Sequence, residues 1–250
     1  NKPYGIIFVT GPTGSGKSTT LYAGLSSVNA EDVKVITVED PVEYQLKGVL
    51  QVQANPSIGL TFAATLRSML RHDPDIIMVG EVRDSDTAQI SVQAALTGHL
   101  VLSTLHTNDA ASGVTRLLDM GIEPYLISSS VEAFIAQRLV RLLCPECKAA
   151  AEVDDVVLKA FGLPETLRGT TIYQPRGCKA CRMSGYHGRT AIAEFLIMDE
   201  ELRGLVVQRR TAGEIKSAAV RKGMKTLRQH GWERVKSGLT SAGEVLQATQ

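Results

Sequence analysis

The chain has 250 residues, of which 44% are hydrophobic, so it can bury one large core and a smaller appended unit. Its formal net charge is +1, which gives no general reason to expect nucleic acid or an anionic membrane as a partner. No apolar run reaches the roughly 18 residues of a membrane span, and the chain start lacks the pattern of a secretion signal. A cytoplasmic protein is therefore expected. The chain begins without an initiator Met and enters a buried strand by Gly5, so an upstream domain is expected to be missing from this sequence.

The first 142 residues alternate apolar and amphipathic segments, which predicts an α/β fold. Four β-branched segments predict strands: GIIFVT, KVITVED, IIMVGE and LVLSTL. Between them, TFAATLRSMLRHD and DTAQISVQAALTG have helical spacing. Repeated βα units form a predominantly parallel sheet, and ligands bind such sheets at the carboxyl ends of the strands. The segments at these ends are expected to converge on one site: GPTGSGKS, EDPVE, GEVRD and HTND.

The following region predicts a long helix and then a polar insert. Residues 124–143, PYLISSSVEAFIAQRLVRLL, predict a helix that leads to the first cysteine pair. Three apolar residues are interpreted as its core stripe: Leu139, Leu142 and Leu143. Arginines at helical spacing predict surface ion pairs: Arg67, Arg71, Arg138 and Arg141. DDVVLKAFG predicts a short helix, and GYHGRTAIAEFLIM predicts a turn and a strand.

The last fifty residues predict a small helical bundle. Its expected helices are DEELRGLVVQRR, TAGEIKSAAVRKG, KTLRQHGWERVKSG and SAGEVLQAT. Thr211 and Glu214 form the capping-box pattern T-x-x-E, and Ser241 and Glu244 repeat it.

Residues 11–18, GPTGSGKS, fit the phosphate-binding pattern G-x-x-x-x-G-K-[ST] between a predicted strand and a predicted helix. Lys17 is expected to reach the β- and γ-phosphates, Ser18 to offer Mg²⁺ a hydroxyl, and Thr19 to bind the α-phosphate. A glycine-rich turn is the alternative, but the segments on both sides fit a nucleotide site. The expected nucleotide-binding residues are Gly11, Pro12, Thr13, Gly14, Ser15, Gly16, Lys17, Ser18 and Thr19.

Hydrolysis requires acidic groups in addition to the phosphate loop. In VITVEDPVEY, Glu39 and Asp40 end a strand, and Glu43 follows in the turn. A carboxylate beyond the strand end can reach past the γ-phosphate, so Glu43 is the predicted general base and Glu39 a second candidate. The alternative is a solvated acidic turn.

The segment IIMVGEVRD supplies the predicted magnesium acid. Gly80 removes the side chain at the strand tip, which leaves room for Glu81 to hold Mg²⁺ through water. Arg83 and Asp84 are expected to fix the loop, and a structural ion pair is the alternative for those two residues.

Two histidines flank the strand LVLSTL. His99 fits a structural role, which is the commoner role of a lone histidine. His106 lies in a Thr/His/Thr/Asn cluster at the carboxyl end of the strand, so it is a candidate sensor of the γ-phosphate.

The cysteines form two C-x-x-C pairs, CPEC and CKAC. Four thiolates can close a tetrahedral Zn²⁺ shell, which leaves no position for a substrate and so indicates a structural site. Free thiols or a redox pair are the alternatives. The expected zinc ligands are Cys144, Cys147, Cys178 and Cys181.

Basic residues surround the cysteines: Lys148, Lys179, Arg182, His187 and Arg189. A basic zinc knuckle can bind nucleic acid, so a nucleic-acid-stimulated translocase is an alternative function. Tyr186 is the one aromatic side chain in the cluster that could stack on a base, so no nucleic-acid partner is expected.

Four segments, in order, resemble motifs of the secretion ATPase superfamily. GPTGSGKSTTLYAGL resembles its Walker A motif, ITVEDPVEY its Asp box, LRSMLRHDPDIIMVGEVRD its atypical Walker B motif, and TGHLVLSTLHTNDA its His box. The two cysteine pairs resemble those of the assembly ATPases of type II secretion and type IV pili, whereas pilus retraction ATPases generally lack them. The resemblance covers nearly the whole chain.

This resemblance implies a RecA-like ATPase that acts as a cytoplasmic homo-hexamer on inner-membrane platform proteins. MgATP hydrolysis would drive type II secretion or type IV pilus extension, and membrane association would be indirect. By matching its motifs, the resemblance also implies that Glu43 is the general base and that Glu81 is the Walker B glutamate. It also implies a preceding domain, expected to be missing here, that supplies arginines to a neighbouring subunit.

The expected domains are a RecA-like P-loop domain over residues 1–142, a tetracysteine zinc module over 143–197 and a C-terminal helical subdomain over 198–250. A nucleotide-dependent structural switch with little turnover is a further alternative function.

Overall fold

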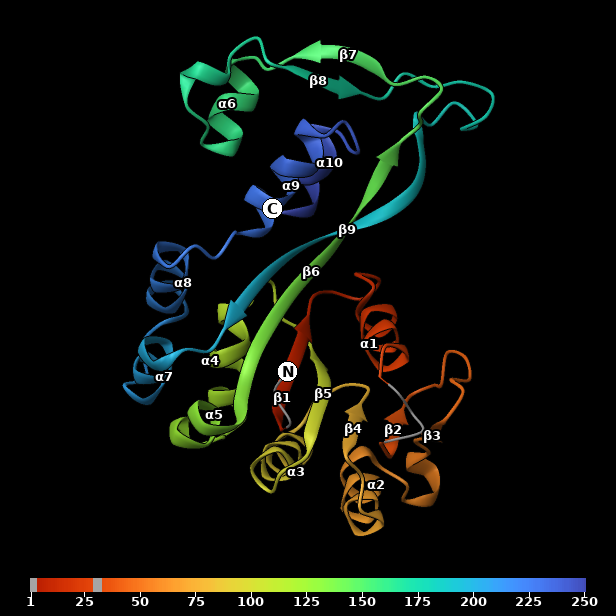
Figure 1. The fold of residues 1–250 in the computed structure, drawn as a ribbon, viewed down its shortest axis with the longest axis vertical. Coiled ribbons are helices and arrows are strands. Elements are labelled where there is room, and N and C mark those ends of the chain that lie inside the picture. Colours follow the sequence, from red (N-terminus) through yellow and green to blue (C-terminus); the bar gives the residue numbers. More distant parts are fainter. Residues whose placement is uncertain (1–3, 29–32) are drawn as a thin grey trace. The chain divides into compact units, whose positions relative to one another are not determined.

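The computed structural model describes residues 4–28 and 33–250 (Figure 1). Residues 1–3, where the first predicted domain begins, and residues 29–32 lie outside the described residues. The chain forms two compact units. Unit 1 comprises residues 1–136 and 195–224, and unit 2 comprises residues 137–194 and 225–250. The division into three consecutive domains stays a prediction.

A seven-stranded sheet has the order β3-β2-β4-β5-β1-β6-β9 (Figure 1). The four predicted strands are confirmed as β1 (Gly5–Thr10), β2 (Val35–Glu39), β4 (Ile76–Val79) and β5 (Leu100–Leu105). These four strands pair in parallel, so their carboxyl ends lie at one edge of the sheet. β3 (Val49–Gln53) was not predicted, and it pairs in parallel with β2. Its residues are only partly buried, which explains its weaker sequence pattern.

Five helices of unit 1 connect or flank these strands. They are α1 (Lys17–Ser26), α2 (Phe62–Met69), α3 (Ser85–Leu96), α4 (Ala111–Asp119) and α5 (Pro124–Ser130). Short 3-10 turns occupy Pro56–Ile58 and Leu70–His72. Helix α1 buries Leu21, Tyr22 and Leu25 in a core cluster that includes Val9 and Met78 of the sheet. This packing fixes the helix that follows the phosphate loop.

The predicted single helix over 124–143 is wrong. Helix α5 ends at Ser130, and the remaining residues form strand β6 (Val131–Leu143), which pairs in parallel with β1. Pairing places Phe134 against Phe8, with the ring centroids 5.6 Å apart. Residues 131–143 form a strand and not a helix, because pairing with β1 and the β-branched residues stabilise the strand more than the helical spacing stabilises a helix. Arg138, Arg141 and the three leucines therefore lie on a strand, and Arg141 binds Glu244 far along the chain.

Unit 2 contains a two-stranded antiparallel sheet of β7 (Ala149–Glu152) and β8 (Thr171–Gln174), neither of which was predicted. The predicted short helix is confirmed as α6 (Asp155–Phe161), and a 3-10 turn spans Glu165–Leu167. The predicted strand is confirmed as β9 (Tyr186–Ile197), which begins in unit 2 and ends in unit 1.

The four tail helices are confirmed as α7 (Glu200–Val207), α8 (Ala212–Arg221), α9 (Leu227–Lys236) and α10 (Ala242–Ala248). The first two belong to unit 1 and the last two to unit 2. In unit 2, Phe161 of α6 packs on Trp232 of α9, with ring centroids 5.3 Å apart. Among the described residues, no helix combines the length and apolar character needed to cross a bilayer.

The capping predictions for the tail are confirmed in one case and partly wrong in the other. Thr211 and Glu214 form the full reciprocal capping box at the start of α8. Ser241 accepts a hydrogen bond from the Glu244 amide, but the Glu244 carboxylate binds Arg141 instead of closing the box. The distant cation competes successfully because a charged, bidentate partner binds a carboxylate more strongly than one amide.

Candidate active site and metal centre

The phosphate loop joins β1 to α1 at the carboxyl edge of the sheet. Gly14 and Gly16 have φ angles of 79° and 86°, a conformation that favours glycine. The Lys17 ammonium donates to the carbonyl oxygens of Gly11 and Pro12 at 2.9 and 3.0 Å, so the lysine lies over its own loop. The loop thus combines a flexible cation, glycine backbone and a helix N-terminus, as phosphate binding requires.

Glu39, at the end of β2, is a buried carboxylate at the centre of a hydrogen-bond network. Tyr22 of α1 donates its hydroxyl to one carboxylate oxygen. Thr37 and Gln51 donate to the other oxygen at 2.5 and 3.1 Å. Three donors to one buried carboxylate satisfy most of its hydrogen-bonding capacity and hold it in one position.

Tyr22 also determines where the following acidic turn lies. The Glu43 amide donates to the Tyr22 hydroxyl at 3.3 Å, whereas the Glu43 side chain is exposed at the carboxyl edge. Burial and the hydrogen bond to Glu39 raise the pKa of Tyr22 to about 12, so its hydroxyl stays protonated as a donor. No motif in the sequence marks Tyr22 or Gln51 as a site residue. Gln51 gave no signal because its strand was not predicted, and Tyr22 is an ordinary aromatic position in an apolar helix.

Glu81 lies between two basic side chains. One of its carboxylate oxygens is 2.5 Å from the Arg83 guanidinium, and the other is 3.4 Å from His106 Nε2. The Glu81 side chain is only 13% exposed, whereas those of Arg83 and His106 are 67% and 46% exposed. The structure therefore brings together the Walker B-like acid and the His-box histidine from the ends of β4 and β5.

Gly80 lies too close to β2 for a larger residue. A Cβ atom there would meet the Val38 carbonyl oxygen at 3.2 Å and the Glu39 Cα at 3.3 Å. The Gly80 carbonyl accepts from Thr104 Oγ1 at 2.7 Å. Because Gly80 has no side chain, β4 can pack closely against β2 directly before Glu81.

Asp84 and His99 have structural roles, as expected. Asp84 caps α3 by accepting from the Thr87 amide at 2.8 Å. His99 lies at the amino end of β5, where its Nδ1 contacts the Ala94 carbonyl at 2.9 Å. The structure confirms that the phosphate loop and the acidic, GEVRD and HTND segments follow the carboxyl ends of neighbouring parallel strands.

The cysteines form a compact cluster in unit 2. Sγ atoms are 3.9 Å apart for Cys144 and Cys178, 3.8 Å for Cys147 and Cys181, and 3.7 Å for Cys178 and Cys181. A tetrahedral shell with metal–sulfur bonds of about 2.3 Å places its sulfurs about 3.8 Å apart. The four sulfurs therefore fit a tetrahedral shell.

Backbone amides surround these sulfurs. Gly177 donates to Cys147 Sγ at 3.3 Å, and Cys178 and Gly185 each donate to Cys181 Sγ at 3.2 Å. Burial acts to raise the pKa of the Cys181 thiol, but these two amides, together with hydrogen bonds from the Cys178 and Cys147 side chains, lower it to about 6. The lowered pKa favours the Cys181 thiolate, which is the form that binds metal.

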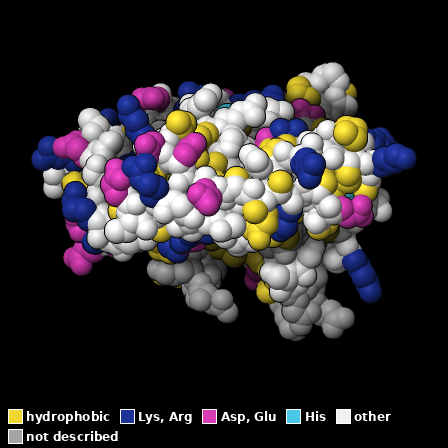
Figure 2. Space-filling model, turned by 90° about the horizontal axis from the view of Figure 1, so that it is seen from above, with side chains coloured by type: hydrophobic (Ala, Val, Ile, Leu, Met, Phe, Trp, Pro, Cys, Tyr) yellow, Lys and Arg dark blue, Asp and Glu magenta, His cyan; other side chains and the backbone are white. Residues whose placement is uncertain are grey.

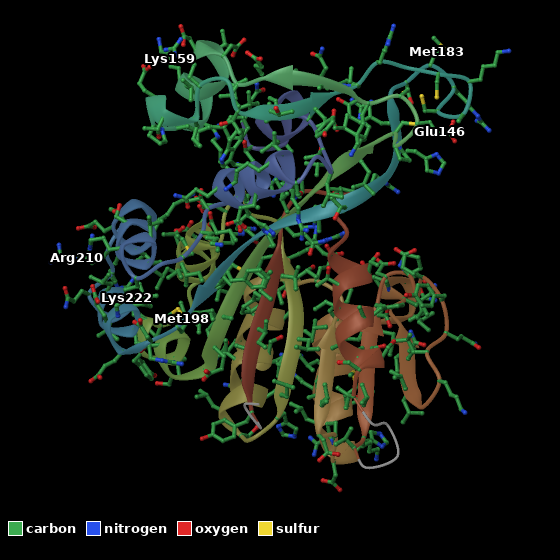
Figure 3. The ribbon with its side chains drawn as sticks, turned by 45° about the horizontal axis from the view of Figure 1, so that its top comes forward. Glu146, Lys159, Met183, Met198, Arg210 and Lys222 are labelled. Atoms are coloured by element: carbon green, nitrogen blue, oxygen red, sulfur yellow. The ribbon has the colours of Figure 1, made fainter. Side chains whose placement is uncertain are left out.

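Tyr186 and Lys148, which lie near the cysteines in the sequence, make contacts within unit 2. The Arg141 guanidinium stacks on Tyr186 at 4.1 Å from the ring centroid, and the Tyr186 hydroxyl lies 2.8 Å from Ser241 Oγ. Lys148 lies 4.6 Å from the Tyr173 ring centroid and donates to the Gly238 carbonyl at 3.0 Å. Figure 3 labels Met183 and Glu146, which are close to the cysteines in the sequence, and Met183 is 70% exposed. On the face shown in Figure 2, basic and acidic side chains are interspersed.

Comparison with known proteins gives relatives over the full length of the chain. The type IV pilus assembly ATPase PilB of Myxococcus xanthus is 53% identical over 248 residues, which cover 98% of this chain and 44% of that protein. The type II secretion system ATPase E of Vibrio cholerae is 51% identical over 250 residues, which cover 100% of this chain and 49% of that protein. The chain thus spans less than half the length of these relatives.

Solved structures with the same fold include a pilus retraction motor and a bacterial ATPase. The pilus retraction motor PilT with bound ADP has a TM-score of 0.70 and 29% identity, covering 98% of this chain and 61% of that one. The ATPase DotB of Legionella pneumophila has a TM-score of 0.68 and 26% identity, covering 98% and 60%. A family model described as "Type II/IV secretion system protein" matches residues 1–247. The resemblance read from the motifs is confirmed, and the chain belongs to the type II/IV secretion system protein family.

Proposed function

We propose that this chain is the catalytic portion of an ATPase that powers type II secretion or the assembly of type IV pili. The observation that supports it most strongly is the meeting of Glu81 and His106 at the sheet edge that carries the phosphate loop and the Glu43 turn. Relatives at 53% and 51% identity are named as ATPases of those two systems. The catalytic role, substrate and partners of the whole protein belong to this proposal.

The site residues have separate roles in this proposal. Lys17 leaves the Gly11 and Pro12 carbonyls to bind the β- and γ-phosphates, and the amides of residues 11–19 bind the phosphate oxygens. Glu43 orients the attacking water and accepts its proton. Glu39, held by its three donors, acts as a positioning residue through Tyr22 and the Glu43 amide. His106 responds to the γ-phosphate through its contact with Glu81.

Mg²⁺ fits the oxygen donors of this site. The Ser18 hydroxyl and the Glu81 carboxylate are the groups that would hold it, directly or through water, since Mg²⁺ prefers oxygen ligands and retains several waters. When bound with ATP, the ion neutralises charge on the phosphate oxygens. Arg83 is 2.5 Å from Glu81 and fixes the carboxylate from the other side.

Zn²⁺ fits the cysteine cluster because its sulfurs lie at tetrahedral separations and those of Cys147 and Cys181 receive amide hydrogen bonds. We assign Cys144, Cys147, Cys178 and Cys181 as its ligands. Four thiolates leave no open position, so the metal would stabilise unit 2 without taking part in hydrolysis.

The remaining parts of the proposal concern assembly. The protein would act as a homo-hexamer in the cytoplasm, and platform proteins of the inner membrane would receive its mechanical work. These parts rest on the resemblance to the secretion ATPase superfamily, and relatives named for type IV pilus assembly and type II secretion are consistent with them.

The experiment that tests this proposal compares ATP turnover of the full-length protein and its Glu43→Gln variant, with the oligomer mass recorded. Loss of the base is expected to lower turnover by about 100-fold or more, while ATP affinity stays within a few-fold. Equal turnover in the two proteins would contradict the role of Glu43. ATP binding without turnover in any oligomer would favour a structural switch, and stimulation by DNA or RNA would favour a translocase.

A further inference from the structure

The loop between β5 and α4, residues 106–110, carries His106 and therefore determines where the imidazole lies against Glu81. Asp109 stabilises the far end of this loop. Its Oδ1 accepts from the Ser112 amide at 2.9 Å and from Ser112 Oγ at 2.5 Å, which closes the start of α4. Thr107 Oγ1 donates to the Asp109 carbonyl at 3.0 Å. The conformation of the His106 loop thus depends on the position of Asp109.

The second oxygen of Asp109 binds a residue far along the chain. Lys216 of α8 donates from Nζ to Asp109 Oδ2 at 2.8 Å. The two side chains are 34% and 24% exposed, so water screens this ion pair only in part. Burial acts to raise the pKa of Asp109, but hydrogen bonds from Lys216 and Ser112 lower it below its ordinary value. Asp109 is therefore charged at neutral pH.

The helices on both sides of this contact are firmly placed in unit 1. Helix α4 approaches the sheet closely, since a Cβ atom on Gly113 would lie 2.5 Å from the Phe134 ring. Helix α8 begins at the full capping box and packs against α4. Small shifts of α8 are therefore transmitted to Asp109 through a short, charged contact.

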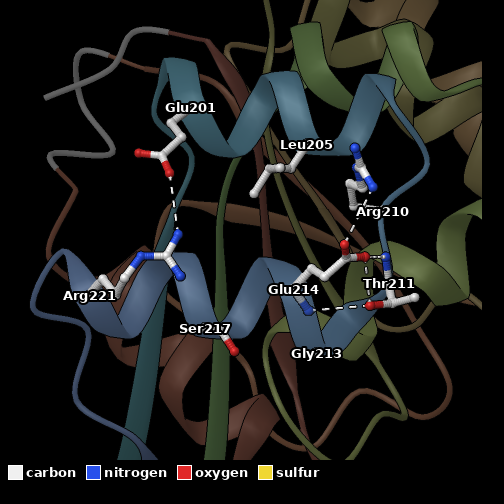
Figure 4. Close-up of a pocket in the computed structure, with 8 residues that line it drawn as sticks. All are labelled: Glu201, Leu205, Arg210, Thr211, Gly213, Glu214, Ser217 and Arg221. Atoms are coloured by element: carbon white, nitrogen blue, oxygen red, sulfur yellow. Dashed lines mark hydrogen bonds and ion pairs between the residues drawn. The ribbon is translucent and has the colours of Figure 1, made fainter.

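The opposite side of α8 faces a groove of about 650 Å³ between α7 and α8. Figure 4 shows Glu201 and Arg221 joined across this groove, with their charged atoms 3.7 Å apart. Lys222 binds Asp199 and Glu201 at 2.6 and 2.9 Å. These ion pairs make α7 and α8 one structural element, of which Lys216 is the contact to the His106 loop.

We propose that Lys216 is a positioning residue for the nucleotide site. Through Asp109 it holds the His106 loop so that the imidazole lies on Glu81, and the α7–α8 pair and the nucleotide site thereby influence each other. This inference rests on the proposed ATPase function. It assigns a role in hydrolysis to a residue of the helical tail, which acts through Asp109.

The test compares Lys216→Met with Lys222→Met in the full-length protein. Lys216→Met removes the ion pair with Asp109, and Lys222→Met removes the two pairs with Asp199 and Glu201 at the end of α8. Of these two lysines, Lys216 is the one that contacts the His106 loop. Lys216→Met is expected to lower kcat about five- to twenty-fold and to change KM for ATP less than about twofold. Lys222→Met is expected to leave both constants unchanged, and Lys216→Arg to retain most of the activity. Equal losses in Lys216→Met and Lys222→Met would overturn the proposal.

A double variant separates positioning from a general loss of stability. If Lys216 acts through His106, adding Lys216→Met to His106→Gln lowers kcat little beyond the His106→Gln value. Two independent effects would instead multiply, and that result would overturn the proposal.

Amide hydrogen exchange of residues 106–112 gives a readout that does not depend on turnover. Faster exchange there in Lys216→Met, with no change in Lys222→Met, is expected. If the wild-type protein hydrolyses no ATP, the proposed function fails, and this exchange result alone decides whether Lys216 positions the loop. Unchanged exchange in both variants would overturn it.

Discussion

The cysteine cluster and the nucleotide site hold their functional atoms in different ways. In unit 2, Cys144 and Cys181 are buried, and backbone amides hold the sulfurs of Cys147 and Cys181. In unit 1, Glu43 is exposed, Lys17 lies on loop carbonyls, and Glu81 is held by exposed basic side chains. The backbone therefore fixes the cysteine cluster, whereas the side chains of the site in unit 1 can change partners. This difference fits the structural metal proposed for unit 2 and the catalytic cycle proposed for unit 1.

The largest expected effect is that of metal removal, which should act on unit 2 alone. Structural zinc contributes on the order of 10 kcal/mol to the folding of small domains. Chelation is therefore expected to expose the four thiols and make residues 137–194 sensitive to protease, while ATP binding by unit 1 persists. Thiol titration, limited proteolysis and nucleotide binding on the same sample measure this. If the phosphate loop loses ATP before the cysteine region opens, the contrast between the two regions is wrong.

An intermediate effect is expected at Tyr22, whose buried hydroxyl joins Glu39 to the Glu43 turn. Tyr22→Phe leaves Glu39 with fewer donors, so unfolding should become easier by about 1–3 kcal/mol. Turnover should fall more than ATP affinity, because the Glu43 amide also loses its partner. Denaturant unfolding and steady-state kinetics measure the two effects. Tyr44→Phe is the matched control, since Tyr44 is 54% exposed and packs on Tyr22 through its ring. Similar losses of stability and turnover in Tyr22→Phe and Tyr44→Phe would contradict a specific role for the Tyr22 hydroxyl.

The smallest expected effect concerns the pair that joins α10 to β6. Hydrogen bonds from Arg141 lower the pKa of Glu244 below its ordinary value, with burial acting in the opposite direction. Because the folded-state pKa is the lower one, this stabilisation is present above the ordinary pKa and is lost as pH falls through the lowered one. Glu244→Gln is therefore expected to destabilise unit 2 by about 1 kcal/mol at pH 7, and the difference should disappear in acid.

Thermal unfolding of Glu244→Gln against pH measures this effect. Glu233→Gln serves as the control, because Glu233 binds the exposed Lys225 and its side chain is 43% exposed. A pH-independent loss in Glu244→Gln would mean that packing, and not the ion pair, holds α10.

Local patterns predicted those parts of the fold that short segments determine. The β-branched segments gave the four central strands, and the glycine spacing with Lys17 and Ser18 gave the phosphate loop. The prediction failed for residues 131–143, where helical spacing of leucines and arginines competes with parallel pairing to β1. It also missed β3, so Gln51 could not be recognised as a partner of Glu39.

The sequence by itself determined the residue types of both sites and their order along the chain. Glycine, lysine, carboxylates and paired cysteines have chemistry and spacing that are readable without coordinates. Only the tertiary structure decided which side chains meet: His106 with Glu81, Tyr22 with Glu39, and Lys216 with Asp109. The physical reason is distance along the chain. A local pattern reports the conformation of neighbouring residues, whereas these contacts form when strands and helices from separate segments pack together.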